Sequence, residues 1–255
     1  MANTVDTVEL ERRVKGVYRA VAEAPDEEYH FEMGRVLAER LGYRNADLDR
    51  VPADAVESFA GVGYHFDLAA LQESDAVLDL GSGSGTDVFV AALRVGDTGN
   101  VTGLDMTKEQ LAKARQLRDE VGLDNVVLER GYIEELPFED GTFDAVISNG
   151  VINLSAEKER VFAEASRVLK PEGRLALSDI VSETEMPDSI KTNADLWAAC
   201  IGGMQINDYI DVIETSGFDV FELRENPQYE FTSEQAQGAC QTYGVKSISL
   251  GARKR

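Results

Sequence analysis

The chain has 255 residues, 43% of them hydrophobic, which suits one large packed domain and leaves little room for a second. Its net charge is −22, from 47 acidic and 25 basic side chains, so nucleic acid and anionic membrane surfaces are disfavoured as partners. No stretch holds the roughly 20 apolar residues that span a bilayer, and Met1 to Leu10 lack the apolar core of a secretory signal.

The excess acid is spread along the chain rather than gathered in a tail. A charge this large exceeds the roughly 2–8 typical of small domains, and high salt would screen the self-repulsion that it creates. We therefore favour adaptation to a high-salt cytoplasm, with an ordinary acidic protein as the alternative.

The two cysteines, Cys200 and Cys240, form no C-x-x-C pair, and together with His30 and His65 they do not make a metal site. With no export signal in the sequence, both thiols are expected to be reduced in the cytoplasm.

The first 75 residues predict a helical N-terminal cap. A helix is expected over Val5–Ala24 and another over Phe31–Leu41, and residues 58–64 predict a loop because they contain two glycines. The apolar stripe of the first helix consists of Val5, Val8, Val14, Val17 and Val21. We expect residues 1–75 to extend the main domain, residues 76–255, rather than to fold separately.

From Ala76 onward, short apolar segments alternate with helical patterns. Strands are expected at 77–80, 101–104, 126–128, 143–147, 175–180, 218–223 and 245–250. Helices are expected at 86–94, 107–120, 157–169 and 207–215. The alternation predicts an α/β, Rossmann-like fold with a seven-stranded, mostly parallel sheet. No helix is evident between the last two strands, so one of them is expected to run antiparallel.

A glycine-rich loop, Gly81-Ser82-Gly83-Ser84-Gly85, directly follows the first strand of the sheet. Ligands of open α/β sheets bind at the carboxyl ends of the strands, and glycines let the backbone approach them closely. A tight strand-to-helix turn without a ligand is the alternative. The spacing is not the dinucleotide pattern G-x-G-x-x-G, because Thr86 stands where its third glycine would fall.

Asp105 ends the second strand, 20 residues after Gly85. A carboxylate there can accept both hydroxyls of a ribose. The alternative is that Asp105 caps the helix that starts near Lys108. Asp105 is compatible with nicotinamide and sulfonium nucleosides alike, whereas the glycine spacing favours the second.

The pattern G-x-G-x-G resembles the loop of class I S-adenosylmethionine-dependent methyltransferases, and the resemblance covers about residues 75–180. It implies S-adenosyl-L-methionine as the cofactor. It places adenine contacts at Gly131-Tyr132-Ile133-Glu134, and the methionine part and the acceptor near Ser148-Asn149-Gly150. A turn role is the alternative for Asn149. The cofactor residues implied are Asp79, Gly81, Ser82, Gly83, Gly85, Asp105, Met106, Tyr132, Ile133, Glu134 and Asn149.

A narrower resemblance, over roughly residues 58–217, is to the arsenite methyltransferases. Its most specific elements are Val151-Ile152-Asn153-Leu154 and Cys200-Ile201-Gly202-Gly203. The other matching stretches are 77–83, 101–107, 131–134, 146–150, 175–180 and 196–199. It implies a small-molecule substrate, arsenite or its thiol conjugate.

The family's chemistry depends on cysteines, because thiolates hold soft trivalent arsenic and can aim its lone pair at the sulfonium methyl. Cys200 matches the family's acceptor-site cysteine, and Cys240 matches one found in some members. A small buried apolar role is the alternative for each. Gly150 replaces a family cysteine, and the cysteine expected before the first strand is absent. Glutathione, another thiol or solvent would then supply a third arsenic ligand.

Two other functions stay open from the sequence. One is methylation of a small organic acceptor, which Gly150 favours by removing a thiol and for which His65 is a weak candidate general base. Tyr64 and Phe66 would line that site or pack in the core. The other is binding of S-adenosylmethionine without turnover.

Overall fold

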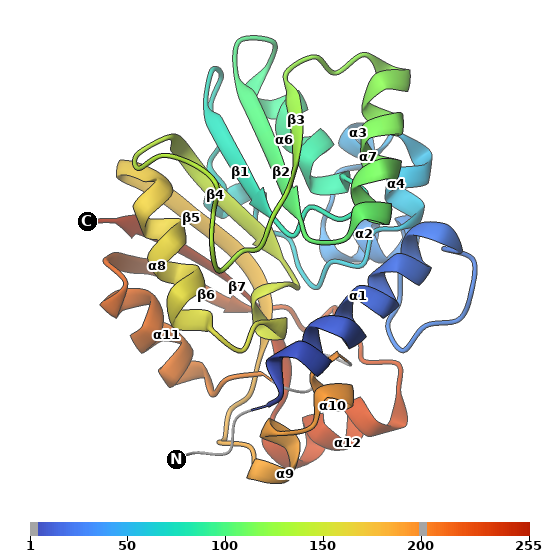
Figure 1. Ribbon diagram of the computed structural model, residues 1–255, viewed down its shortest axis with the longest axis vertical. Coiled ribbons are helices and arrows are strands. Elements are labelled where there is room, and N and C mark those ends of the chain that lie inside the picture. The colour runs from blue at the N-terminus through green and yellow to red at the C-terminus, as the bar shows by residue number, and fades with distance from the viewer. Residues whose placement is uncertain (1–4, 199–202) are drawn as a thin grey trace.

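A computed structural model describes residues 5–198 and 203–255, and its centre is one seven-stranded sheet (Figure 1). The spatial order is β3-β2-β1-β4-β5-β7-β6. The strands are β1 Ala76–Leu80, β2 Asn100–Asp105, β3 Val126–Arg130, β4 Phe143–Asn149, β5 Leu169–Val181, β6 Phe218–Glu225 and β7 Lys246–Lys254. Strands β1 to β5 pair in parallel, and β7 runs antiparallel to both β5 and β6. The expected mostly parallel sheet with one reversed strand is confirmed.

Helices cover both faces of the sheet. The longer ones are α1 Thr7–Glu23, α6 Thr86–Val95, α7 Lys108–Val121, α8 Lys158–Val168, α11 Ile206–Thr215 and α12 Glu234–Tyr243. The short ones are α2 Arg35–Leu41, α3 Asn45–Leu48, α4 Ala53–Glu57, α5 Phe66–Ala69, α9 Asp188–Lys191 and α10 Ala194–Ala198, with a 3-10 turn, η1, at Ile152–Leu154. One hydrophobic cluster packs the six helices from α2 through α7 against one face of the sheet. A second cluster packs α8 and α11 against the other face.

The central strands are buried on both sides, which explains their continuous apolar sequence. Along β1, Val77 belongs to the first cluster while Leu78 and Leu80 belong to the second. Along β4, Ile147 packs in the first and Val146 in the second. Successive side chains of a strand point to opposite faces, so a run of Val, Leu and Ile fills both cores at once.

The N-terminal helices differ from the sequence expectation in two respects. The predicted helix Phe31–Leu41 begins only at Arg35, because Gly34 precedes it at φ +86°, outside helical geometry. In α1, Val8 is 76% exposed, and the buried side chains are Leu10, Val14 and Val21. The division of the chain at residue 75 stays a prediction.

The C-terminal third contains helices that the sequence did not suggest. Helix α12 lies between β6 and β7, where none was expected, and α9 and α10 precede the segment 199–202, which lies outside the described residues. Helix α12 is only weakly amphipathic, with Ala236 and Ala239 as its buried residues, so the sequence lacks a clear helical stripe there. Within the two described ranges, no helix is both long and apolar enough to cross a membrane.

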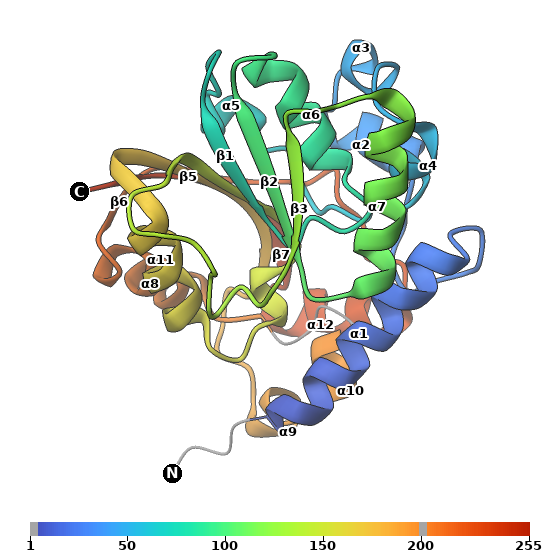
Figure 2. The same ribbon diagram turned by 45° about the horizontal axis from the view of Figure 1, so that its top comes forward.

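Helix α1 runs past the ends of the strands rather than packing against a face of the sheet (Figure 2). It contacts α7 on one side and α10 on the other. This position brings α1 over the carboxyl ends of the first strands, where the candidate site is found.

Candidate cofactor and acceptor site

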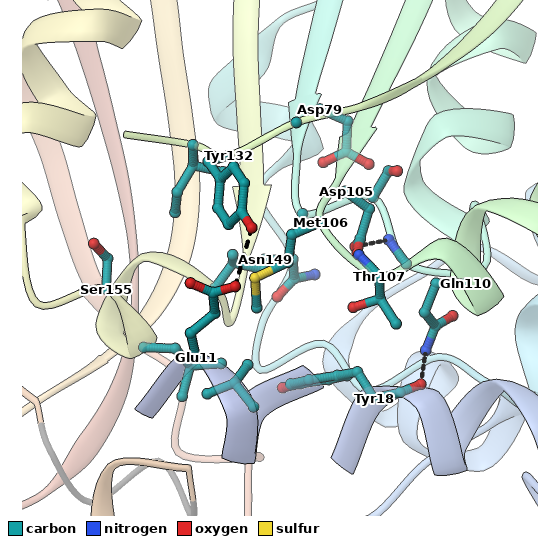
Figure 3. A pocket seen from close by; sticks show the side chains of 18 of the residues that line it. Glu11, Tyr18, Asp79, Asp105, Met106, Thr107, Gln110, Tyr132, Asn149 and Ser155 are labelled. Carbon is teal, nitrogen blue, oxygen red and sulfur yellow. Dashed lines mark hydrogen bonds between the residues drawn. The ribbon is translucent and has the colours of Figure 1, made fainter. Parts of the chain in front are cut away.

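A cavity of about 380 Å³ lies between α1 and the carboxyl ends of β1, β2 and β4 (Figure 3). All the predicted cofactor residues except Gly85 line it: Asp79, Gly81, Ser82, Gly83, Asp105, Met106, Tyr132, Ile133, Glu134 and Asn149. These residues come from four separate strand ends, and the parallel sheet gathers them because its strands end at one edge.

The glycine loop has the backbone shape that the sequence suggested. Gly81, Gly83 and Gly85 have φ of +74°, +53° and +99°, in the left-handed region that favours glycine. A Cβ on Gly81 would lie 2.5 Å from the Val151 side chain, and one on Gly85 would lie 2.8 Å from the ring of Phe89. Gly85 therefore serves the packing of the loop against α6, whereas Gly81 and Gly83 form the cavity wall.

Asp105 holds the loop in place while facing the cavity. Its Oδ2 accepts the Gly83 N–H at 2.9 Å and its Oδ1 accepts the Thr107 N–H at 2.7 Å. Burial raises the pKa of Asp105, while those two N–H groups act to lower it. The ribose role and the capping role are compatible, because each oxygen still has a lone pair for a ligand hydroxyl.

Asp79 is the buried acid that lacks a partner. Its side chain is 2% exposed, lines the cavity, and has no hydrogen-bond partner among the described residues. Burial, followed by the nearby acids Asp87 and Asp105, raises its pKa well above the usual range. An acid in this state is stabilised by a cation, and S-adenosylmethionine carries two, an ammonium and a sulfonium. The cavity therefore fits that cofactor.

Asn149 lines the cavity, but its polar atoms are already engaged. Its Oδ1 accepts the N–H of Val62 at 2.8 Å, and its Nδ2 donates to the Tyr43 hydroxyl at 3.0 Å and to Asp87 Oδ2 at 3.1 Å. The Tyr43 hydroxyl in turn donates to Asp87 Oδ1 at 2.5 Å. These bonds fill the structural role given as the alternative, and a cofactor contact stays a prediction.

Helix α1 supplies cavity residues that the sequence analysis missed: Thr7, Leu10, Glu11, Val14 and Tyr18. Figure 3 shows Glu11 reaching Tyr132, whose hydroxyl donates to Glu11 Oε1 at 3.0 Å. Gln110 of α7 donates to the Tyr18 carbonyl at 2.8 Å. The signal in the sequence for these residues was the amphipathic pattern of α1. That pattern shows that one face of the helix is buried but does not identify the segment that buries it.

Of the two cysteines predicted to bind the acceptor, the structure describes Cys240 but not Cys200. Cys200 lies outside the described residues, three positions after Trp197. Cys240 is half-buried on α12 and does not line the cavity; burial raises the pKa of its thiol. Cys240 and Trp197 belong to one hydrophobic cluster, which also contains Leu10 and Leu154 of the cavity wall. Their roles as arsenic ligands stay predictions.

Gly150, which replaces a family cysteine, has a strained position for any other residue. Its φ is +73°, and a Cβ there would lie 3.1 Å from Val62 Cγ1. Its N–H donates to the Ser178 carbonyl at 2.8 Å, which fixes the turn after β4. A side chain at this position therefore requires a small shift of the Val62 side chain as well as a strained backbone.

His65 is fully buried away from the cavity, and neither ring nitrogen has a hydrogen-bond partner among the described residues. Burial lowers its pKa, and its ring stacks on Phe66. Tyr64 and Phe66 pack with the first hydrophobic cluster rather than lining the cavity. All three residues therefore fit a role in core packing better than a role in contacting the methyl acceptor.

A family model described as "Methyltransferase domain" matches residues 71–235. An arsenite methyltransferase of Halobacterium salinarum is 40% identical over 73% of this chain and 48% of its own, and one of Homo sapiens is 44% identical over 50% and 36%. The chain thus spans about half, or less, of the length of these curated relatives.

Solved structures are similar as well. An arsenic(III) S-adenosylmethionine methyltransferase from Chlamydomonas reinhardtii is 33% identical, with a TM-score of 0.68 over 88% of this chain and 74% of the other. A geranyl diphosphate C-methyltransferase from Streptomyces coelicolor, in complex with S-adenosyl-L-homocysteine, has a TM-score of 0.69 at 15% identity over 98% and 99%. The second likeness shows the fold alone.

Proposed function

The chain belongs to the methyltransferase-domain family, as a class I S-adenosylmethionine-dependent methyltransferase that resembles the arsenite methyltransferases, and from this premise we propose that it methylates trivalent arsenic. The observation that carries the proposal is the similarity to the arsenic(III) methyltransferase structure, at 33% identity over most of both chains. The Trp197-x-x-Cys200 sequence, which matches the acceptor-site element of that family, agrees with it.

When bound, S-adenosylmethionine supplies an electrophilic methyl group. In our proposal, Asp105 accepts hydrogen bonds from the ribose, and Asp79 faces the ammonium or sulfonium charge. Tyr132 and Ile133 lie beside the adenine, while α1 covers the cavity and reduces the access of water.

The thiolates of Cys200 and Cys240 would hold arsenic, with a third ligand from a small thiol or solvent. The arsenic lone pair forms the new As–C bond while the methyl's old bonding pair remains with sulfur, so no base is needed. Rate enhancement would then come mainly from positioning. This agrees with the position of His65, the base considered for an organic acceptor, which lies away from the cavity. The organic-acceptor alternative loses that base.

A methyl-transfer assay on the full chain in high salt, with arsenite and methylarsenite, tests the proposal. Cys200→Ser is expected to lower kcat/KM by at least about 100-fold, since thiolate coordination positions the reacting atom, and Cys240→Ser by less. Binding of S-adenosylhomocysteine should be unchanged in both variants. Wild-type protein that binds this cofactor product but yields no methylated arsenic would exclude the proposed substrate.

The same assay, run at several salt concentrations, tests whether the protein is adapted to high salt. A cytoplasmic location and adaptation to high salt are proposals that rest on the cysteine usage and on the net charge of −22. Activity and melting temperature that rise with KCl up to molar concentrations would support the salt adaptation, because screening reduces the repulsion among the acids.

A further inference from the structure

Lys158, at the start of α8, is a buried cation that directly follows three residues of the cavity lining, Ser155, Ala156 and Glu157. Only 2% of it is exposed, and its ammonium donates to the carbonyls of Asn153 at 3.1 Å and Ser155 at 2.6 Å. Buried lysines are rare unless a structure gives them specific partners. Both carbonyls belong to the end of η1, the turn that follows β4.

A second partner comes from a distant part of the chain. The Lys158 ammonium lies 4.6 Å from the centre of the Trp197 ring, at the end of α10. Trp197 is the chain's single tryptophan, and its indole N–H has no hydrogen-bond partner among the described residues. The ammonium therefore makes a cation–π contact with the face of the ring, and such a contact is stronger when the cation is buried away from water.

The acids near Lys158 do not replace these partners. The charges of Asp179 on β5, of Glu159 on α8 itself and of Glu134 after β3 all favour the ammonium form. However, the Asp179 carboxyl is held by the Tyr209 hydroxyl at 2.6 Å and by backbone N–H groups. Burial is the larger influence and lowers the pKa of Lys158 to about 8.

The contact links two stretches of the sequence that carry the resemblance to the arsenite methyltransferases, residues 151–154 and residues 196–203. Leu154 and Ser155 of the turn line the cofactor cavity, and Trp197 stands three positions before Cys200. We propose that Lys158 is a positioning residue, which fixes Trp197 against the turn after β4 and thereby shapes the acceptor side of the methyl-transfer site. This inference rests on the proposed arsenic chemistry for its kinetic test only.

The kinetic test compares Lys158→Met, which keeps the length of the side chain without its charge, with Lys158→Arg and with Lys170→Met as the matched control. Lys170 pairs with Asp144 at 2.8 Å, away from the cavity. Lys158→Met should raise the KM for methylarsenite about tenfold, while the Kd for S-adenosylhomocysteine changes less than about twofold. Lys158→Arg should recover most of the loss, and Lys170→Met should behave as wild type.

An unchanged acceptor KM in Lys158→Met, or an equal loss of cofactor and acceptor binding, would overturn the inference. If Lys158→Met does not fold, Trp197→Leu tests the contact from its other side and should give the same rise in acceptor KM. If arsenic proves not to be the acceptor, the rate at which a thiol reagent labels Cys200 in a Cys240→Ser background replaces KM. Lys158→Met should change that rate severalfold, and an unchanged rate counts against the proposal.

The single tryptophan provides a direct signature of the contact. Emission of Trp197 should titrate with a midpoint near pH 8 in the wild type, as Lys158 loses its charge, and should not titrate there in Lys158→Met. The double variant Cys200→Ser, Cys240→Ser excludes thiol ionisation and should keep the transition. A transition that persists in Lys158→Met would show that another group is responsible and would contradict the contact.

Discussion

The proposed cofactor half of the site, at the ends of β1 and β2, and the proposed acceptor half, around Trp197 and Cys240, are built in different ways. Asp79, Gly83 and Asp105 lie within 27 positions of one another and stand where β1 and β2 end. Trp197 comes from α10 and Cys240 from α12, far along the chain, and both pack against one shared hydrophobic cluster. The first half is positioned by the ends of neighbouring strands, and the second by packing between distant segments.

The two halves also differ in charge. The proposed cofactor half has buried acids, and one of them, Asp79, has no hydrogen-bond partner among the residues that the structure describes. The proposed acceptor half is mainly apolar and contains the buried cation Lys158. An acidic wall suits a cationic cofactor, and an apolar wall suits arsenic held by thiols. Variants of the two halves should therefore separate cofactor binding from acceptor binding.

The largest separation is expected from Asp105→Ala. It removes an acceptor that the structure bonds to the Gly83 and Thr107 N–H groups and that would also bind the ribose. Loss of charge-assisted bonds should weaken S-adenosylhomocysteine about 100-fold by calorimetry, with arsenic binding unchanged. Asp124→Ala, at an exposed turn, is the control. A loss below threefold would remove Asp105 from the cofactor site.

The next effect is a dependence of cofactor affinity on pH. Burial and the acids Asp87 and Asp105 raise the pKa of Asp79 in the free protein, and a bound cation should lower it again. Affinity then increases as pH rises between the two pKa values, by up to about tenfold per pH unit, with release of a proton. Calorimetry in buffers of different ionisation enthalpy measures that proton. The same measurement with S-adenosylhomocysteine, which has the ammonium but lacks the sulfonium charge, shows which of the two cations lowers the pKa of Asp79.

The variant Asp79→Asn sharpens this test. It should abolish the pH dependence and weaken cofactor binding. It should also raise the free energy of unfolding at neutral pH by about 1 kcal/mol or more, because a carboxyl whose folded pKa is raised costs stability above its unfolded pKa. Lower stability in urea denaturation would mean that the Asp79 charge is already satisfied in the protein.

A smaller effect is expected in the acceptor half, from restoring a thiol at Gly150. Gly150→Cys places a side chain at φ +73°, 3.1 Å from Val62 Cγ1, and should cost about 1–2 kcal/mol of unfolding free energy. Adding Val62→Ala should relieve the steric contact but leave the backbone strain. Urea denaturation of the single and double variants then separates the two contributions to the free energy of unfolding. Full stability of the single variant would show that the loop moves freely.

The smallest effect concerns the cover of the cofactor half. Glu11→Gln weakens the bonds that Glu11 makes to Tyr132 and Lys15 at the rim of the cavity. Dissociation of S-adenosylhomocysteine should accelerate about two- to fivefold, as expected for loss of one partly exposed polar contact. Glu9→Gln on the same helix, whose carboxylate pairs with Arg12 away from the cavity, should leave the rate unchanged.

The sequence by itself determined the sheet, the glycine loop and Asp105, because strand periodicity and loop chemistry are local and parallel strands end at one edge. Only the tertiary structure decided that α1 covers the cavity, that Asn149 is bonded to its own protein, and that Lys158 meets Trp197. Those facts depend on contacts between segments tens of residues apart, and helical or strand periodicity shows that a face is buried without showing which segment buries it.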